Sequence, residues 1–297
     1  MRKAEEKYIN PLTDFGFKKL FGTEQNKDLL IDFLNELLPD RKIKDLTYST
    51  NEHFGKYEID RKAIFDIYCV GENDECFIVE MQKAKQNYFK DRSLFYASFP
   101  IQEQALRGDW DYRLEPVFSI GILDFEFDEH KKDKDLLHIV ELKNQKCEVF
   151  YDKLKFIYIE LPKFTKKQSE LKTHFDKWMY VFTHLQKLQD RPKALQERVF
   201  KKLFDVAEIA GFSEKERKEY EKSLKTYRDI KNVVDTAREE GKVEGRIEGK
   251  IEGKIEERKG VIERCVEANM SPEVIAKLVN MPLSEVKKIT DKIKKRK

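Results

Sequence analysis

Two apolar runs separated by a polar turn constrain the fold of this chain more than any other stretch. The first run is Ile64–Val70 and the second is Cys76–Gln82, and both are rich in β-branched and aromatic residues. The five residues between them, Gly71–Glu75, are polar or glycine. This pattern predicts a β-hairpin with a short loop. If the hairpin is symmetric about Asn73, the position of each residue in one strand fixes its partner in the other.

The symmetric register places two acids opposite each other, because Asp66 and Glu80 both stand seven positions from Asn73. Like charges directly opposite destabilise a sheet, and the burial of unpaired charge costs more. Side chains alternate along a strand, so Gln82 shares the face of Glu80. Together the three side chains offer an oxygen-rich site that suits Mg²⁺. The alternative is a sheet with one solvated face, on which charged residues are ordinary, and spacing alone leaves both interpretations open.

The composition is that of a folded chain without a membrane segment. The 59 Lys and Arg nearly balance the 56 Asp and Glu, so the net charge of +3 identifies no partner. The 21 Phe and 12 Tyr argue against disorder. No apolar run approaches the roughly 20 residues of a membrane helix, and the N-terminus lacks the apolar segment of a secretory signal. We therefore expect a cytoplasmic protein with no membrane partner.

The spacing of cysteine and histidine gives little support to a zinc site or a histidine nucleophile. The four cysteines form no Cys-x-x-Cys pair, and Cys69 and Cys76 lie in the hairpin strands, where they are expected as small core residues. The five histidines are expected to form no cluster; they are His53, His130, His138, His174 and His184.

Helical and strand patterns alternate in residues 1–165, which we expect to form the core domain. Capping residues and a final glycine predict a short helix from Thr13 or Asp14 to Gly22. A later helix has the length of a crossover between parallel strands and carries Arg92 and Tyr96 on one face. The other predicted elements are the helix Asn26–Leu38, the strand Ile43–Thr50, the crossover helix Tyr88–Arg107, and the strands Pro116–Leu123, Leu136–Leu142 and Phe156–Leu161.

Helical patterns dominate after the core, first in an extension at residues 166–230. Residues 231–260 contain four consecutive Gly-basic-aliphatic-Glu repeats, which begin at Gly241. Each glycine costs a helix about 1 kcal/mol relative to alanine, but glycine also permits close approach of a second helix. This stretch is therefore either a self-associating helical arm or a solvated, partly frayed spacer. The predicted helices of the extension are Gln168–Leu188, Ala194–Ala210 and Glu214–Glu239.

A compact pattern returns in residues 261–297. Ser271, Pro272 and Glu273 provide an N-cap, a proline at the first helical position and an acid in the first turn. Ser284 restarts a second short helix, so the pair is typical of a helix-turn-helix. The chain from Lys287 onward is strongly basic, which suits the neutralisation of DNA phosphates. A solvated tail and a cap on the helical arm are alternatives that stay open.

Several motifs in this order resemble the PD-(D/E)XK nuclease superfamily, and more narrowly the family of recombination-promoting nucleases and transposases. The resemblance covers residues 9–228. It implies an α/β fold, with a restriction-endonuclease-like mixed sheet flanked by helices and an all-helical C-terminal extension. The motifs are Leu12–Gly22, Phe65-Asp66-Ile67, Val79-Glu80-Met81-Gln82, Arg92 with Tyr96, and the strand Pro116–Phe125.

The resemblance implies a magnesium-dependent endonuclease that hydrolyses DNA phosphodiester bonds, with Mn²⁺ as a substitute ion, in recombination or a mobile element. Asp66 and Glu80 would ligate the ion, with the backbone carbonyl of Met81 as a further ligand. Asp14 matches the extra acid that such nucleases bring from an N-terminal helix, although an N-cap role explains it equally well. The partner that the resemblance implies is DNA. The repeats of the helical arm, if it self-associates, add a second copy of the chain.

Gln82 departs from the superfamily pattern, which usually has lysine at this position. Glutamine can orient a water molecule but carries no positive charge. Lys83 points to the opposite face of the strand, so we expect Arg92, or Lys85 beyond the strand end, to supply the charge. The departure also motivates an alternative function, a catalytically weak or inactive nuclease-fold protein that acts as a DNA-binding or assembly module. A transposase would also have to join strands, and the sequence shows no separate feature for that step.

Overall fold

The computed structural model describes residues 6–49, 52–53, 63–105 and 111–294. These residues fall into two compact units, Met1–Lys231 and Asn232–Lys297, which are described separately below. The four-part division inferred from the sequence stays a prediction. The ends of three predicted segments, at Thr50, Arg107 and Lys295–Lys297, lie outside the described residues. No helix in the described part of the chain is both long and apolar enough to cross a membrane.

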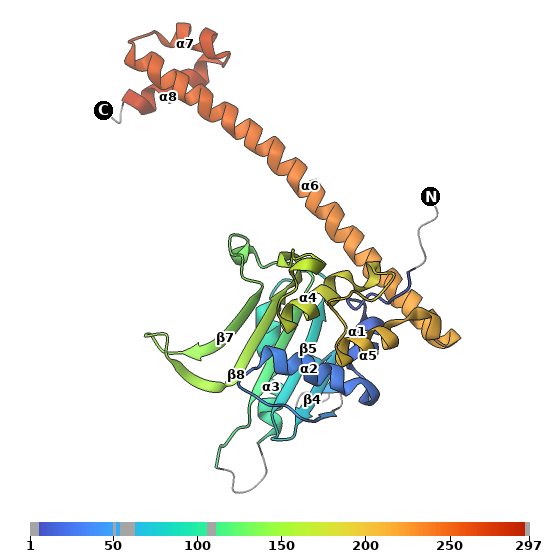
Figure 1. Cartoon of the computed structure of the whole chain (residues 1–297). Coiled ribbons are helices and arrows are strands. Elements are labelled where there is room, and N and C mark those ends of the chain that lie inside the picture. Colours follow the sequence, from blue (N-terminus) through green and yellow to red (C-terminus); the bar gives the residue numbers. More distant parts are fainter. Residues whose placement is uncertain (1–5, 50–51, 54–62, 106–110, 295–297) are drawn as a thin grey trace. The chain divides into compact units, whose positions relative to one another are not determined.

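A six-stranded mixed sheet forms the centre of the first unit (Figure 1). Its strand order is β1-β4-β5-β6-β8-β7, and the pairs β5–β6 and β6–β8 are parallel while the other neighbours are antiparallel. This arrangement confirms the expected α/β fold of the restriction-endonuclease type and the parallel crossover. The strands are β1 Leu46–Tyr48, β4 Ile67–Gly71, β5 Cys76–Gln82, β6 Val117–Leu123, β7 Leu137–Lys143 and β8 Val149–Glu160.

The predicted hairpin is formed by β4 and β5, and its register is symmetric about Asn73 as expected. Four residue pairs show this, from Ile67 opposite Val79 to Val70 opposite Cys76. The first predicted strand is nevertheless interrupted. Ile64 belongs to a separate two-stranded sheet of β2 (Glu52–His53) and β3 (Ala63–Ile64), and Asp66 lies in a bend just before β4. The bend turns the ring of Phe65 towards Tyr68 and Tyr96, so Phe65 does not continue the strand alternation.

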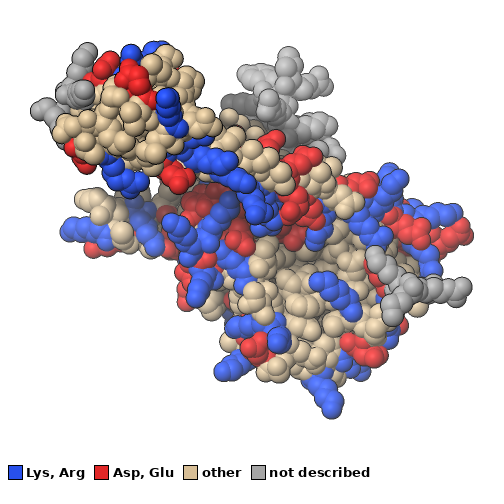
Figure 2. Space-filling model, turned by 90° about the horizontal axis from the view of Figure 1, so that it is seen from above, with Lys and Arg blue, Asp and Glu red and all other residues tan. Residues whose placement is uncertain are grey.

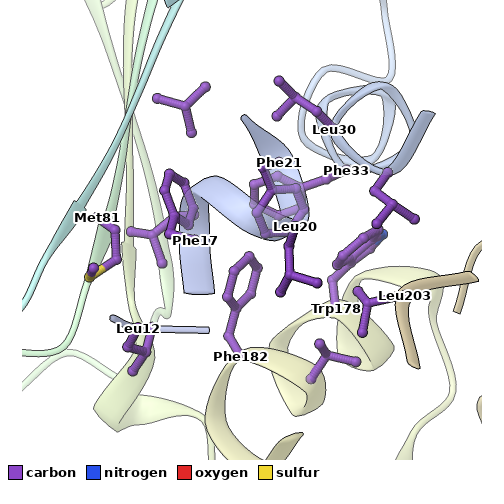
Figure 3. Packing of buried hydrophobic residues seen from close by; sticks show 14 of the residues in the cluster. Leu12, Phe17, Leu20, Phe21, Leu30, Phe33, Met81, Trp178, Phe182 and Leu203 are labelled. Atoms are coloured by element: carbon purple, nitrogen blue, oxygen red, sulfur yellow. The ribbon is translucent and has the colours of Figure 1, made fainter. Parts of the chain in front are cut away.

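Helices cover both faces of this sheet. Odd-numbered residues of β5, such as Met81, pack in the main core with α1, α2, α4 and α5, and Figure 3 shows this packing around Phe21 and Trp178. Even-numbered residues such as Ile78 pack in a second cluster with α3. The alternation therefore directs Glu80 and Gln82 towards the α3 face. The helices are α1 Asp14–Phe21, α2 Lys27–Leu37, α3 Phe89–Glu103, α4 His174–His184 and α5 Arg198–Ala207.

Short 3₁₀ helices connect several of these elements. One of them, η2 (Asp128–His130), follows β6 and carries a histidine near the end of the sheet. The others are η1 Glu24–Asn26, η3 Leu161–Lys163, η4 Gln168–Glu170, η5 Leu185–Lys187 and η6 Ile209–Gly211.

The start of α1 settles which residue caps it. The side-chain oxygen of Thr13 accepts a hydrogen bond of 3.0 Å from the backbone N–H of Gly16, so Thr13 is the N-cap. Gly16 has no alternative here, because a Cβ atom would lie only 2.1 Å from the carbonyl oxygen of Asn10. Asp14 is the first helical residue, and its carboxylate forms an ion pair of 3.0 Å with Lys18. The N-cap explanation of Asp14 is therefore wrong.

The long helix α6 (Glu214–Glu267) begins in the first unit and continues into the second. It runs without interruption through the glycine repeats, whose aliphatic residues remain half-exposed: Val243, Ile247, Ile251 and Ile255. Two further helices follow, α7 (Pro272–Val279) and α8 (Leu283–Lys294). A small core of Ile262, Cys265, Ile275, Val279 and Val286 joins them to the end of α6. The two predicted short helices of the tail are thus confirmed.

Candidate active site

The candidate site begins with Glu80 and Gln82 on the α3 face of β5. Glu80 is only 8% exposed. The side-chain amide of Gln82 donates a hydrogen bond of 3.3 Å to the Glu80 carboxylate. The expectation that these two residues share a face is confirmed, and the amide is directed at an acid rather than at open solvent.

Asp66 reaches β5 from the bend that precedes β4. Its Oδ2 accepts a hydrogen bond of 2.8 Å from the backbone N–H of Met81. Successive residues of a strand direct their backbone groups to opposite sides. Because the carbonyl of Gln82 accepts from the N–H of Asp124, beyond β6, the carbonyl of Met81 points to the side of Asp66. The structure thus brings together two carboxylates and a carbonyl that were predicted as ligands.

Both acids have raised pKa values. The pKa of Glu80 is raised to about 7, mainly by burial and also by the charge of Asp66, and Arg92 and Gln82 offset only part of this effect. Burial also raises the pKa of Asp66, although the hydrogen bond from Met81 opposes the change. Two buried carboxylates without a cation between them resist simultaneous ionisation, so this environment favours the binding of a positive ion.

Arg92 approaches the same site from the first turn of α3. Its Nη2 lies 3.8 Å from Oε2 of Glu80, and its guanidinium stands over the rings of Phe89 and Tyr96 at 5.3 and 5.7 Å. Its Nη1 donates to the side chain of Gln86. Its Nε and Nη2 are buried and have no hydrogen-bond partner among the residues that the structure describes. Two donors of Arg92 beside Glu80 are therefore left without a hydrogen bond to the described residues.

A second group of charges lies on the other face of β5, beside α1. Lys83 follows the last residue of β5, and a cavity of about 670 Å³ is lined by Asp14, Lys18, Lys83 and, from α6, Lys222. The side chain of Lys83 lies on the opposite face of the strand from that of Gln82, as expected. Burial lowers the pKa of Lys83, while the nearby charges of Asp14 and Asp66 raise it. Lys83 therefore acts electrostatically on Asp66, although its position in the alternation suggested that it was remote from the site.

Lys85, which was expected as an alternative source of positive charge, does not join the site. Two unexpected residues, Gly121 and Tyr158, lie next to it. Lys85 forms an ion pair with Asp128 of η2. In the register of the parallel strands, Glu80 lies beside Gly121, and Gly121 beside Tyr158. A Cβ atom on Gly121 would lie 3.1 Å from the ring of Tyr158. Burial raises the pKa of Tyr158, and the charge of Glu80 adds to the effect. Parallel registers leave no local signal in sequence, so Gly121 and Tyr158 were missed.

With this geometry established, the chain can be compared with known proteins. The model of one family, described as PD-(D/E)XK nuclease family transposase, matches residues 11–237. The chain belongs to this family. The comparison with curated proteins found no match, and neither did the comparison with solved structures.

In this PD-(D/E)XK family protein, the oxygen donors Asp66, Glu80 and the Met81 carbonyl form a set that suits a hard divalent cation. The raised pKa values of both acids and the buried, unpartnered donors of Arg92 fit a site completed by a cation and an anion. Figure 2 shows Lys and Arg atoms next to Asp and Glu atoms across one face of the molecule. That face therefore carries no extended patch of one sign.

Glu80 is expected to make the stability of the metal-free protein depend on pH. Its pKa is about 7 in the folded state against an ordinary value of 4.5. The folded protein therefore binds this proton more tightly than the unfolded chain, and the free energy of unfolding falls as the pH rises from about 4.5 to about 7. The loss amounts to about 3 kcal/mol, since each pKa unit corresponds to about 1.4 kcal/mol.

Urea denaturation at a series of pH values in the presence of EDTA measures this effect. Glu80→Gln should unfold with little pH dependence in that window and should be more stable than the natural protein at pH 8. An equal loss of stability in both proteins would show that Glu80 is not the responsible group.

The histidines correct one expectation from the sequence. His130 and His138 stack with ring centroids 4.0 Å apart, and both lie next to the buried carboxylate of Glu160. The prediction that the histidines form no cluster is wrong, because η2 and the pairing of β7 with β8 bring together residues that are distant in the sequence.

Proposed function

We propose that this protein is a metal-dependent endonuclease that hydrolyses DNA phosphodiester bonds, with Mg²⁺ as its cofactor and Mn²⁺ as a substitute. The observation that carries the proposal is the convergence of Asp66, Glu80 and the Met81 carbonyl at the ends of β4 and β5. Membership in the PD-(D/E)XK nuclease family supports the same activity.

Each side chain has a distinct role in the proposed reaction. Asp66, Glu80 and the Met81 carbonyl hold the ion, which when bound polarises the scissile phosphate and lowers the pKa of the attacking water. The buried donors of Arg92 bind an oxygen of the phosphate and stabilise the charge that develops there. Gln82, whose amide donates to Glu80, uses its remaining hydrogen-bonding capacity to orient the water.

The face beside α1 extends the proposed site. Asp14 lies close enough to influence the pKa of Asp66, and the lysines around the adjacent cavity include Lys18, Lys83 and Lys222. Lysine side chains bind DNA phosphates without reading sequence. In the proposal this cavity holds the DNA backbone next to the cleaved bond, and Lys83 supplements the positive charge of Arg92.

The test uses purified full-length protein and supercoiled plasmid. Magnesium should produce nicked and linear DNA, and EDTA should abolish the reaction. Persistence of cleavage in EDTA, or its absence with both Mg²⁺ and Mn²⁺, would contradict the proposal. Joined strands among the products would instead indicate transposase chemistry.

The amide at position 82 favours one alternative, a nuclease-fold protein that binds DNA and assembles without efficient cleavage. Gln82 stands where the superfamily usually has a charged lysine, and its amide is engaged by Glu80. Calorimetric titration distinguishes the two functions. The alternative requires that neither Mg²⁺ nor Mn²⁺ binds and that Glu80→Gln leaves DNA binding intact.

In this proposal the second unit binds a second copy of the chain and DNA. The aliphatic stripe of α6, which includes Ile247 and Ile251, associates with a second copy of the chain, and the basic α8 contacts DNA. The space around the glycines between the stripe residues is empty, since an added Cβ atom would meet nothing within 4 Å. A neighbouring helix can therefore approach closely.

Replacement of two stripe residues should weaken this self-association. Ile247→Gln with Ile251→Gln is expected to raise the dissociation constant at least about 100-fold, because each isoleucine contributes roughly 1.5–3 kcal/mol when fully buried. Sedimentation velocity measures the change. Lys250→Gln with Lys254→Gln places the same residue type off the stripe and serves as the control. A natural protein that is monomeric at all concentrations would rule out association through the arm.

A further inference from the structure

A second cluster of ligand atoms lies on the α3 face of the sheet, near the carboxyl end of β8. It consists of His130 in η2, His138 in β7 and Glu160 at the end of β8. One ligand atom from each of the three residues lies within 4.8 Å of the other two. Two imidazoles with one carboxylate form a ligand set that suits zinc rather than magnesium.

The distances within the cluster are close to those of a tetrahedral zinc site. Nδ1 of His130 lies 2.9 Å from Oε1 of Glu160, and Nε2 of His138 lies 3.6 Å from Oε2. Ligands at about 2.0–2.1 Å from a tetrahedral ion are roughly 3.4 Å apart. Small side-chain adjustments therefore suffice to place all three ligands around one ion.

The hydrogen bonds among the described residues leave one buried nitrogen atom of the cluster without a partner. Nε2 of His138 is buried and has no hydrogen-bond partner in the described part of the chain, and its separation from Glu160 is too long for a hydrogen bond. A buried polar atom without a partner costs about 1–3 kcal/mol. A bound cation would satisfy this nitrogen, which a purely hydrogen-bonded cluster does not.

Glu160 is fully buried and has several partners. Its Oε1 accepts a hydrogen bond of 3.0 Å from the backbone N–H of Phe127 and lies 2.9 Å from Nδ1 of His130. Lys163 forms an ion pair of 2.6 Å with Oε2. The carboxylate can keep this ion pair while it contributes Oε1 to an ion, because each carboxylate oxygen has two lone pairs.

This cluster is separate from the nuclease site. Glu160 lies in β8, two strand spacings from β5, which carries Glu80, and His138 lies in β7, three spacings away. At about 4.8 Å per spacing these separations amount to roughly 10 Å and 14 Å. Paired catalytic metals lie about 3.5–4 Å apart, so the cluster does not hold a second ion of the proposed cleavage reaction.

We propose that His130, His138 and Glu160 bind one zinc ion per chain, with water in the fourth position. The ion fastens η2 to β7 and β8. Phe127, which precedes η2, packs on Phe89 of α3, and Glu129 of η2 pairs with Lys90 of α3. The zinc site thereby stabilises the surroundings of the helix that carries Arg92.

The experiment measures zinc binding rather than cleavage, so it stands apart from the proposed nuclease activity. Full-length protein is stripped with a chelator and titrated with Zn²⁺ alone in equilibrium dialysis. We expect one tightly bound zinc per chain and an increased melting temperature. His138→Gln and His130→Gln should each weaken binding by roughly 100-fold or more. His184→Gln, which changes a histidine stacked on Tyr180, should bind zinc normally.

The double variant Asp66→Asn with Glu80→Gln separates the two sites and should retain the zinc. Loss of zinc in this variant, with retention in the histidine variants, would place the ion at the nuclease site and overturn the proposal. So would the absence of bound zinc in the natural protein. If the histidine variants fail to fold, Co²⁺ added to the natural protein decides, because a four-coordinate spectrum supports the site and an octahedral spectrum overturns it.

Discussion

Asp66→Asn and Glu80→Gln should each reduce magnesium-dependent plasmid cleavage by at least about 10³-fold. A metal ion contributes several kcal/mol of transition-state stabilisation, and a thousand-fold loss corresponds to about 4 kcal/mol. Both substitutions keep the shape of the side chain but remove the negative charge that would hold the ion. The initial rate of plasmid nicking, measured at saturating Mg²⁺, provides the comparison.

The control for these variants is Asp152→Asn, which changes an exposed acid in β8 by the same chemistry. It should cleave at the natural rate. Circular dichroism verifies that all the variants fold. If either Asp66→Asn or Glu80→Gln cleaves DNA as fast as the natural protein, the assigned site is wrong.

Arg92→Ala should lower the cleavage rate by about 100-fold while the protein still binds metal. Removal of one preorganised donor to a transition-state anion typically costs about 10²–10³ in rate. Arg92 has two buried donors without hydrogen-bond partners in the described structure, next to Glu80. Arg92→Lys keeps the charge but loses the planar pair of donors, so only partial recovery is expected.

Arg113→Ala is the matched control, because Arg113 is largely exposed and pairs with Glu115. A single-turnover rate measured at saturating DNA separates chemistry from binding. If Arg92→Ala cleaves at the natural rate under these conditions, the positive charge of the reaction comes from elsewhere, and Lys83 becomes the leading candidate.

The main features of the fold were predictable because local patterns specify them. Alternating apolar residues and a short polar loop defined the β4–β5 hairpin, and the symmetric register about Asn73 was correct. The strand β6 was predicted within Pro116–Leu123, and all its residues are buried. The shared face of Glu80 and Gln82 followed from strand alternation, whereas the place of Arg92 beside them was implied by the family resemblance.

The parts that could not be predicted depend on contacts between distant segments. The bend at Asp66 forms where the carboxylate meets the N–H of Met81, and no local pattern encodes it. The cluster of His130, His138 and Glu160 needs the pairing of β7 with β8. The electrostatic effect of Lys83 on Asp66 was not expected, because alternation gives the face of a side chain but not the distance over which its charge acts around the end of a strand.

The hydrogen bond between Asp66 and Met81 ties any enzymatic activity of this chain to completed folding. A slip of one residue between β4 and β5 would turn the side chains of one strand to the opposite face. It would also separate the Asp66 carboxylate from its backbone donor. The proposed ion site therefore exists only in the correctly paired sheet. If the proposed cleavage of DNA is correct, a newly made or misfolded chain would be inactive towards the DNA of its own cell.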